Sequence, residues 1–105
     1  MAPQPVLTPE AASDTRLAPR WNVVLLDDDD HTYDYVIEML GAIFGHDVAT
    51  AFTMAMEVDA TGRVIVWSGH REVAELKREQ IHAFGPDPLL PRCEGSMSAV
   101  LERVD

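Results

Sequence analysis

The sequence has only one cysteine, Cys93, among 105 residues. It also has no apolar run approaching the roughly 20 residues that a membrane-spanning helix needs. A single cysteine forms no disulfide within the chain and builds no cysteine-based zinc site, which agrees with a reducing compartment. The first 19 residues lack the basic start and the continuous apolar stretch of a secretion signal. We therefore expect a cytoplasmic protein that makes no membrane contact.

Positive charge is scarce as well. Eight Lys and Arg residues stand against 18 Asp and Glu residues, which gives a formal net charge of −10. Residues 21–62 hold nine of the acids and no Lys or Arg. This balance opposes binding to the phosphates of DNA or RNA, so nucleic acid is not an expected partner. The acidic segment favours a cationic ligand or a basic protein surface, and the simpler alternative is a solvated face that only aids solubility.

Sequence signatures of catalysis are absent too. The chain has no G-x-S-x-G elbow, no glycine-rich phosphate loop and no H-E-x-x-H helix. Cys93 lies in a proline-rich stretch with no histidine nearby, so we interpret it as a bystander. We expect neither an enzyme nor a bound cofactor. No metal-ligand spacing relates the four histidines, which are expected at the surface: His31, His46, His70 and His82.

The densest cluster of charge is the run of four aspartates at 27–30. Several carboxylates together attract hard divalent cations, so a metal site is one hypothesis for this run. Compared with a calcium-binding loop that starts at Asp27, however, the chain has Thr32 where the turn requires glycine. No specific metal ligand is therefore expected. Binding of calcium or magnesium by an acidic protein is kept only as an alternative function.

The chain divides into an arm and one domain. Four of the first 19 residues are proline and no hydrophobic periodicity appears there, so residues 1–20 are expected to form a flexible arm. Residues 21–105 are long enough for a single folded domain. Apolar runs predict strands over 21–26, 63–67 and 97–104.

Helical spacing predicts three helices between these strands. The first covers 33–44, with Thr32 as its cap and Gly45 as its stop. The second begins after Asp47 and closes at the Thr61-Gly62 turn, and the third ends before Gly85. The order β-α-α-β-α-β predicts an α+β protein, a two-layer sandwich in which three helices pack on a three-stranded sheet.

Four motifs in a fixed order carry a resemblance to a known family. They are VVLLDDDDHTYDYVIEML over 23–40, FGHDV over 44–48, TGRV over 61–64 and REVAELK over 71–77. Together they resemble the ClpS family of adaptors for the Clp protease. The resemblance implies a non-enzymatic adaptor that holds the N-terminal residue, or N-degron, of a substrate protein. It also implies that the substrate is passed to an AAA+ unfoldase of the ClpA or ClpC type.

The resemblance assigns three acids to the substrate's α-amino group. The family's asparagine falls on Asp27, its aspartate on Asp28, and its histidine on Asp59. A cationic amine needs charge-assisted acceptors, so three carboxylates can strengthen its binding. They can equally repel one another, with one of them taking up a proton in the absence of a ligand.

The resemblance also assigns a pocket for the first side chain. Tyr33 stands where the family has a gating methionine and Ala55 where it has a pocket methionine, while Val36 and Val58 match as apolar wall. We therefore expect an altered residue preference that extends to Arg or Lys. On helical spacing alone these four residues would be ordinary core. A further alternative is a ClpS-like protein whose pocket no longer reads N-degrons.

Two charged residues of the third helix fall on family positions that touch the unfoldase. These are Glu72 and Lys77, which the resemblance assigns to docking on the N-terminal domain of the unfoldase. On spacing alone both would simply be solvated. The arm over 1–20 would then serve delivery, and the chain is expected to act as a monomer.

Overall fold

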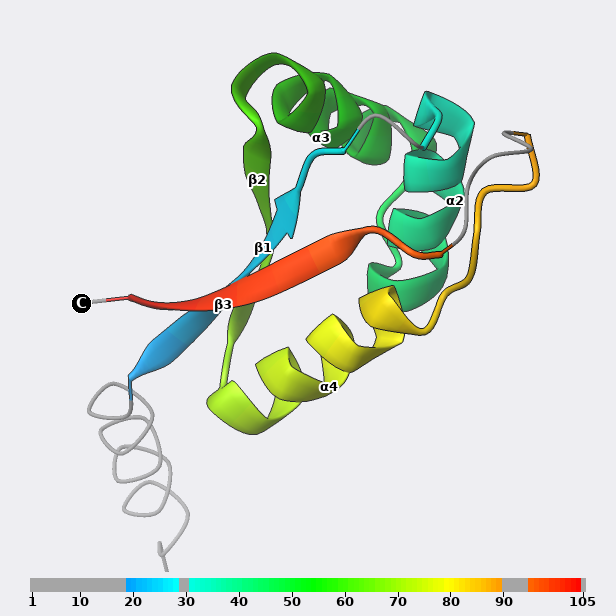
Figure 1. Cartoon of the computed structure of the whole chain (residues 1–105). Coiled ribbons are helices and arrows are strands. Elements are labelled where there is room, and N and C mark those ends of the chain that lie inside the picture. Colours follow the sequence, from blue (N-terminus) through cyan, green and yellow to red (C-terminus); the bar gives the residue numbers. More distant parts are fainter. Residues whose placement is uncertain (1–18, 29–30, 90–94, 105) are drawn as a thin grey trace, which may run out of the picture.

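The computed structural model describes residues 19–28, 31–89 and 95–104. Most of the predicted arm, the aspartates at 29 and 30, and Cys93 lie outside these ranges. The elements are β1 (Arg20–Leu26), α2 (Tyr33–Phe44), α3 (Val48–Thr61), β2 (Arg63–Gly69), α4 (Arg71–His82) and β3 (Ser98–Val104) (Figure 1). The predicted order of strands and helices is confirmed.

The three strands form one antiparallel sheet in the order β2-β1-β3. The central strand β1 is paired along both edges, and its residues Val23, Val24 and Leu25 are fully inaccessible to solvent. The ladder to β2 continues to Ser68 and Gly69, which pair with the first residues of β1. β2 is therefore two residues longer than predicted, because pairing with a neighbour decides where a strand ends.

The helices form the second layer, on one side of the sheet (Figure 1). Of the three strands α3 packs mainly on β2, while α4 packs on all three, and α2 lies against α3 and α4. Their apolar faces and the inner face of the sheet share one hydrophobic core. The two-layer α+β sandwich is thus confirmed. Its largest fully buried apolar side chains include Leu25, Met39, Leu40, Ile81 and Met97.

Local capping explains where α2 and α3 begin and end. The side chains of Thr32 and Asp47 accept hydrogen bonds from backbone N–H groups in the first turn of each helix, as predicted. Hydrogen bonds from Thr50 lower the pKa of Asp47. Each helix ends at a glycine, Gly45 or Gly62, in the left-handed conformation. The cap at Thr32 fixes the point where the acidic segment after β1 enters α2.

A buried carboxylate links this helix start to the segment after α4. Asp87 is only 2% exposed and accepts hydrogen bonds from Thr32 N (2.7 Å), Thr32 Oγ1 (2.8 Å) and Leu89 N (2.9 Å). Burial alone raises the pKa of Asp87, but these hydrogen bonds outweigh it and the pKa is lowered. The ionised carboxylate therefore stabilises the folded chain.

Replacing Asp87 with alanine should lower the free energy of unfolding by about 2 kcal/mol, because buried donors lose their acceptor. Urea denaturation measures this loss. Since the folded pKa is lowered, the contribution of the charge is present above about pH 4 and disappears as the pH falls below it. The stability difference between the wild type and Asp87→Asn should therefore shrink at low pH. An equal difference at pH 7 and at low pH would contradict this role for the ionised form.

Candidate functional site

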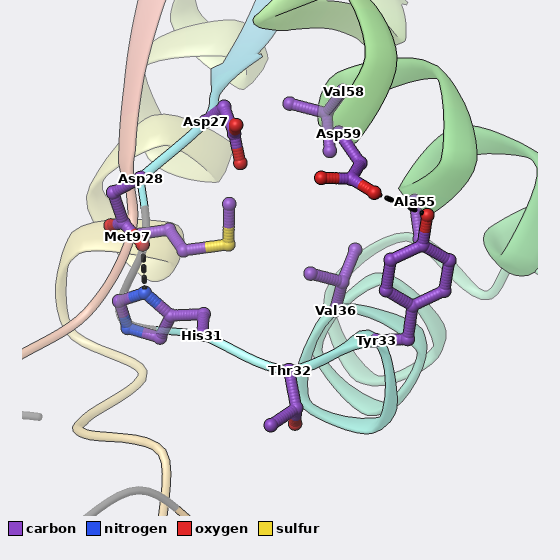
Figure 2. A pocket seen from close by; sticks show the side chains of 10 residues that line it. All are labelled: Asp27, Asp28, His31, Thr32, Tyr33, Val36, Ala55, Val58, Asp59 and Met97. Atoms are coloured by element: carbon purple, nitrogen blue, oxygen red, sulfur yellow. Dashed lines mark hydrogen bonds and ion pairs between the residues drawn. The ribbon is translucent and has the colours of Figure 1, made fainter.

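A cavity of about 190 Å³ lies where the end of β1, the start of α2, the later turns of α3 and the residue before β3 meet (Figure 2). All seven residues that the resemblance assigns to the substrate pocket line it. Three further described residues line it, and sequence reasoning missed them. The ten residues are Asp27, Asp28, His31, Thr32, Tyr33, Val36, Ala55, Val58, Asp59 and Met97.

Apolar side chains line one part of the cavity. Val36, Ala55, Val58 and Met97 are each no more than 4% exposed. Val36 comes from α2, and Ala55 and Val58 are one turn apart on α3, so they share a helix face. Met97 immediately precedes β3 and turns its sulfur toward the cavity (Figure 2). We call these four residues the apolar wall.

Carboxylates form the more exposed part of the lining. Asp27, at the end of β1, and Asp59, on α3, point toward one another across the cavity (Figure 2). The backbone N–H of Asp27 donates to the carbonyl of Gly62 at 3.0 Å, which holds the end of β1 beside α3. Asp28 lines the cavity beside Asp27, with its side chain 36% exposed. The cavity therefore combines an apolar wall with a strongly negative rim.

Tyr33 stands at the side of the cavity. Its hydroxyl donates to Asp59 Oδ2 at 2.8 Å, and its ring meets Phe52 edge to face at 5.7 Å between centroids. The hydrogen bond to Asp59 is the main reason that the pKa of Tyr33 is raised, with burial and the charges of Asp59 and Asp27 adding to it. Tyr33 thus joins α2 to α3 and adds a hydroxyl group to the rim.

His31 is not the surface residue that the sequence predicted. Its side chain is only 3% exposed, with Nδ1 at 2.6 Å from Asp28 Oδ1 and Nε2 at 2.8 Å from the carbonyl oxygen of Gly95. The ring also lies 4.5 Å from the ring of Tyr35, between centroids. The prediction was wrong because Gly95 is 64 positions further along the chain, and contacts over such a distance leave no local sequence pattern.

The two residues assigned to docking lie on α4 and do not line the cavity. Glu72 is exposed in the first turn of the helix. Lys77 is half-buried, because its Nζ donates to the carbonyl of Ile43 at 2.6 Å and lies 5.6 Å from the ring of Phe44. Lys77 therefore supports the end of α2 in addition to any role at the surface.

Two further kinds of feature, a metal site and a membrane-spanning helix, are missing from the described residues. Within the described residues, no three His, Cys, Asp or Glu side chains gather closely enough to hold a metal ion. None of the described helices is both long enough and apolar enough to cross a membrane.

A family of known proteins matches this chain. The model of the family described as "ATP-dependent Clp protease adaptor protein ClpS" matches residues 16–89. The chain belongs to the ClpS family. ClpS proteins are adaptors of the ATP-dependent Clp protease, so the family and the adaptor class expected from the motifs are confirmed.

Individual ClpS proteins are similar over most of the chain. The ClpS of Nostoc sp. is 34% identical over 88 residues, which are 81% of this chain and 91% of that protein. The ClpS of Nautilia profundicola is 32% identical and covers 80% of this chain and 81% of its own length. Among solved structures, Agrobacterium tumefaciens ClpS2 bound to L-phenylalaninamide superposes with a TM-score of 0.70 and 23% identity. That structure covers 82% of this chain and 98% of its own, and it confirms the fold.

The hydrogen bond between Tyr33 and Asp59 can be tested by titration. In an Asp59→Asn variant the pKa of Tyr33 should move down toward the ordinary value for tyrosine, because the carboxylate that stabilises the neutral phenol is gone. Ultraviolet absorbance of the phenolate measures the change, and a Tyr33→Phe variant separates it from the signal of Tyr35. In the control variant Glu38→Gln the pKa should stay raised. An unchanged pKa in Asp59→Asn would rule out the contact.

Proposed function

We propose that this ClpS protein binds the free N-terminal residue of substrate proteins in the cavity and delivers them to a ClpA- or ClpC-type unfoldase. The observation that carries the proposal is the convergence of Asp27, Asp28 and Asp59 beside an apolar wall. An α-ammonium group needs charge-assisted acceptors, and carboxylates are the strongest that a protein offers. No enzymatic step is required for this function.

The apolar wall gives the first side chain a binding surface. Burying a large apolar side chain contributes about 1.5 to 3 kcal/mol, which is enough for a small pocket to favour one residue class over another. L-phenylalaninamide, the ligand of the related Agrobacterium protein, combines a free amine with an aromatic side chain. These are the two chemical groups that the rim and the apolar wall would contact.

The departures from the family support an altered preference for the first residue. Asp27 and Asp59 replace neutral or weakly basic groups of the family pattern and make the rim more negative. Ala55 replaces a methionine and leaves more room along the wall. Arg and Lys are included in the proposed range, because their aliphatic stems can lie on an apolar surface while their charged ends return to carboxylates at the rim.

Short labelled peptides that begin with Phe, Tyr, Trp, Leu, Arg, Lys or Gly test this proposal by fluorescence anisotropy. A subset should bind, and acetylation of the N-terminus should abolish binding because the ammonium charge is lost. Asp28→Ala should weaken binding by at least about tenfold, the usual effect of removing a charged hydrogen-bond partner. Asp34→Ala is the matched control, since this exposed aspartate does not line the cavity.

Two results would contradict the proposal. Binding that is equally strong with acetylated peptides would show that the free amine is not read. A folded protein that binds no peptide at all would instead support the alternative of a ClpS scaffold whose pocket no longer recognises N-degrons.

Delivery requires a second surface, for which we propose the exposed side of α4. Glu72 is accessible there, whereas Lys77 is half-buried, with its Nζ bound to the carbonyl of Ile43. We propose that both residues contact the N-terminal domain of the unfoldase. We also propose that the protein acts as a monomer and that it does so in the cytoplasm.

Charge reversal by Glu72→Lys should weaken binding to the isolated N-terminal domain of the unfoldase by several-fold, because an exposed charge at an interface is replaced by its opposite. Glu72 is the sharper test than Lys77, whose removal also disturbs the end of α2. Glu38→Lys makes the same charge change on the exposed side of α2 and should leave binding unchanged. Calorimetry measures all three proteins, and equal affinities for wild type and Glu72→Lys would remove Glu72 from the docking surface.

A further inference from the structure

Among the described residues that line the cavity, His31 is the one whose side chain can carry a positive charge. It lies in the short connection between β1 and α2, and its side chain is 3% exposed. Both ring nitrogens are within hydrogen-bond distance of an oxygen atom, Asp28 Oδ1 at 2.6 Å and the Gly95 carbonyl at 2.8 Å. The family pattern assigns no role to this position in the motifs described above.

The chemistry of these two partners determines the protonation of the ring. A backbone carbonyl oxygen can only accept a hydrogen bond, so Nε2 must carry a hydrogen. The Asp28 side chain is 36% exposed, and a carboxylate in its ionised form also only accepts hydrogen bonds. Nδ1 must therefore carry a hydrogen as well, and a ring with both hydrogens is an imidazolium cation. The short distance to Asp28 fits a charge-assisted hydrogen bond.

Carboxylates and an aromatic ring surround the imidazole of His31. Asp28 faces it from the end of β1, and the buried carboxylate of Asp87 approaches it from the segment after α4, where the positive charge of His31 contributes to lowering the pKa of Asp87. From α2, the aromatic ring of Tyr35 packs on it. None of the described residues that line the cavity is Lys or Arg.

We propose that His31 is a positioning residue for amine recognition. As a buried imidazolium, it fixes the Asp28 carboxylate in the cavity wall and offsets one of the negative charges of the cavity's aspartates. This inference rests on the proposed function. In the absence of a ligand, the three carboxylates of the cavity repel one another, and a cation within the protein would reduce this repulsion. One oxygen of Asp28 is held by His31, and the substrate's ammonium group would meet a carboxylate whose direction is already set.

Two measurements test this role on the full chain. Nitrogen-15 NMR of the imidazole should show hydrogens on both ring nitrogens of His31 in the wild type at pH 7, and on only one in Asp28→Ala. His31→Gln removes the charge and one of the two donors. It should therefore weaken binding of a free-amine peptide beginning with Phe by about tenfold, the usual effect of a lost charge-assisted hydrogen bond.

Tyr35→Phe is the matched control for a merely structural effect. The hydroxyl of Tyr35 donates to the carbonyl of Gly85 at 2.6 Å, so this variant disturbs the same region without touching Asp28 or His31's hydrogen bonds. It should lower thermal stability and leave peptide affinity within about twofold of the wild type.

The possible outcomes are distinct. A wild-type ring with a single hydrogen, wild-type affinity in His31→Gln, or an equal loss of affinity in His31→Gln and Tyr35→Phe would each overturn the positioning role. Those results would leave the proposed function standing, provided the wild type still binds free-amine peptides. A wild type that binds none of them would overturn the proposed function and the positioning role together.

Discussion

Crowding of negative charge is the constraint on which the rest of this site depends. Asp27, Asp28 and Asp59 line one small cavity in a chain of net charge −10, and like charges in such a space raise the free energy of the folded state. Two contacts answer this cost within the protein. The hydroxyl of Tyr33 donates to Asp59, and the ring of His31 binds Asp28. These contacts fix the orientation of the Asp59 and Asp28 carboxylates.

The fold brings these groups together through its central strand. β1 is paired on both edges, so the point at which it ends is firmly fixed, and the acids follow directly. Asp87, 55 positions further along the chain, accepts two hydrogen bonds from Thr32, the cap of α2. Because α3 and the residue before β3 close the cavity, each of its walls comes from a different part of the sequence. A change in any one of these elements would alter the shape of the pocket.

Much of this arrangement could be predicted from the sequence, because its causes are local. Thr32 and Asp47 are helix caps recognisable by residue type, and Gly45 and Gly62 end the helices as expected. Motif order pointed to the family and, through it, to the acids and apolar residues that line the cavity. The cap and stop residues lie next to the helix ends that they predict, whereas the motif order located the cavity residues only through the family resemblance.

What escaped prediction depends on contacts between distant segments. His31 was expected at the surface, yet Gly95 and Asp28 enclose it. The alternating pattern predicted Met97 as the first residue of a strand, but Met97 precedes β3 and lines the cavity. Pairing with β1 extended β2 as far as Gly69, beyond the reach of its own alternating pattern.

The central claim is that the cavity reads a free amine beside an apolar side chain. A nitrogen-15 NMR titration with L-phenylalaninamide and, in parallel, with its N-acetylated form tests it most directly, since the two ligands differ in the amine alone. Backbone signals of Asp28, Val58 and Asp59 should shift with the free amine and stay in place with the acetylated compound. Equal shifts with both ligands, or shifts confined to other parts of the chain, would contradict it.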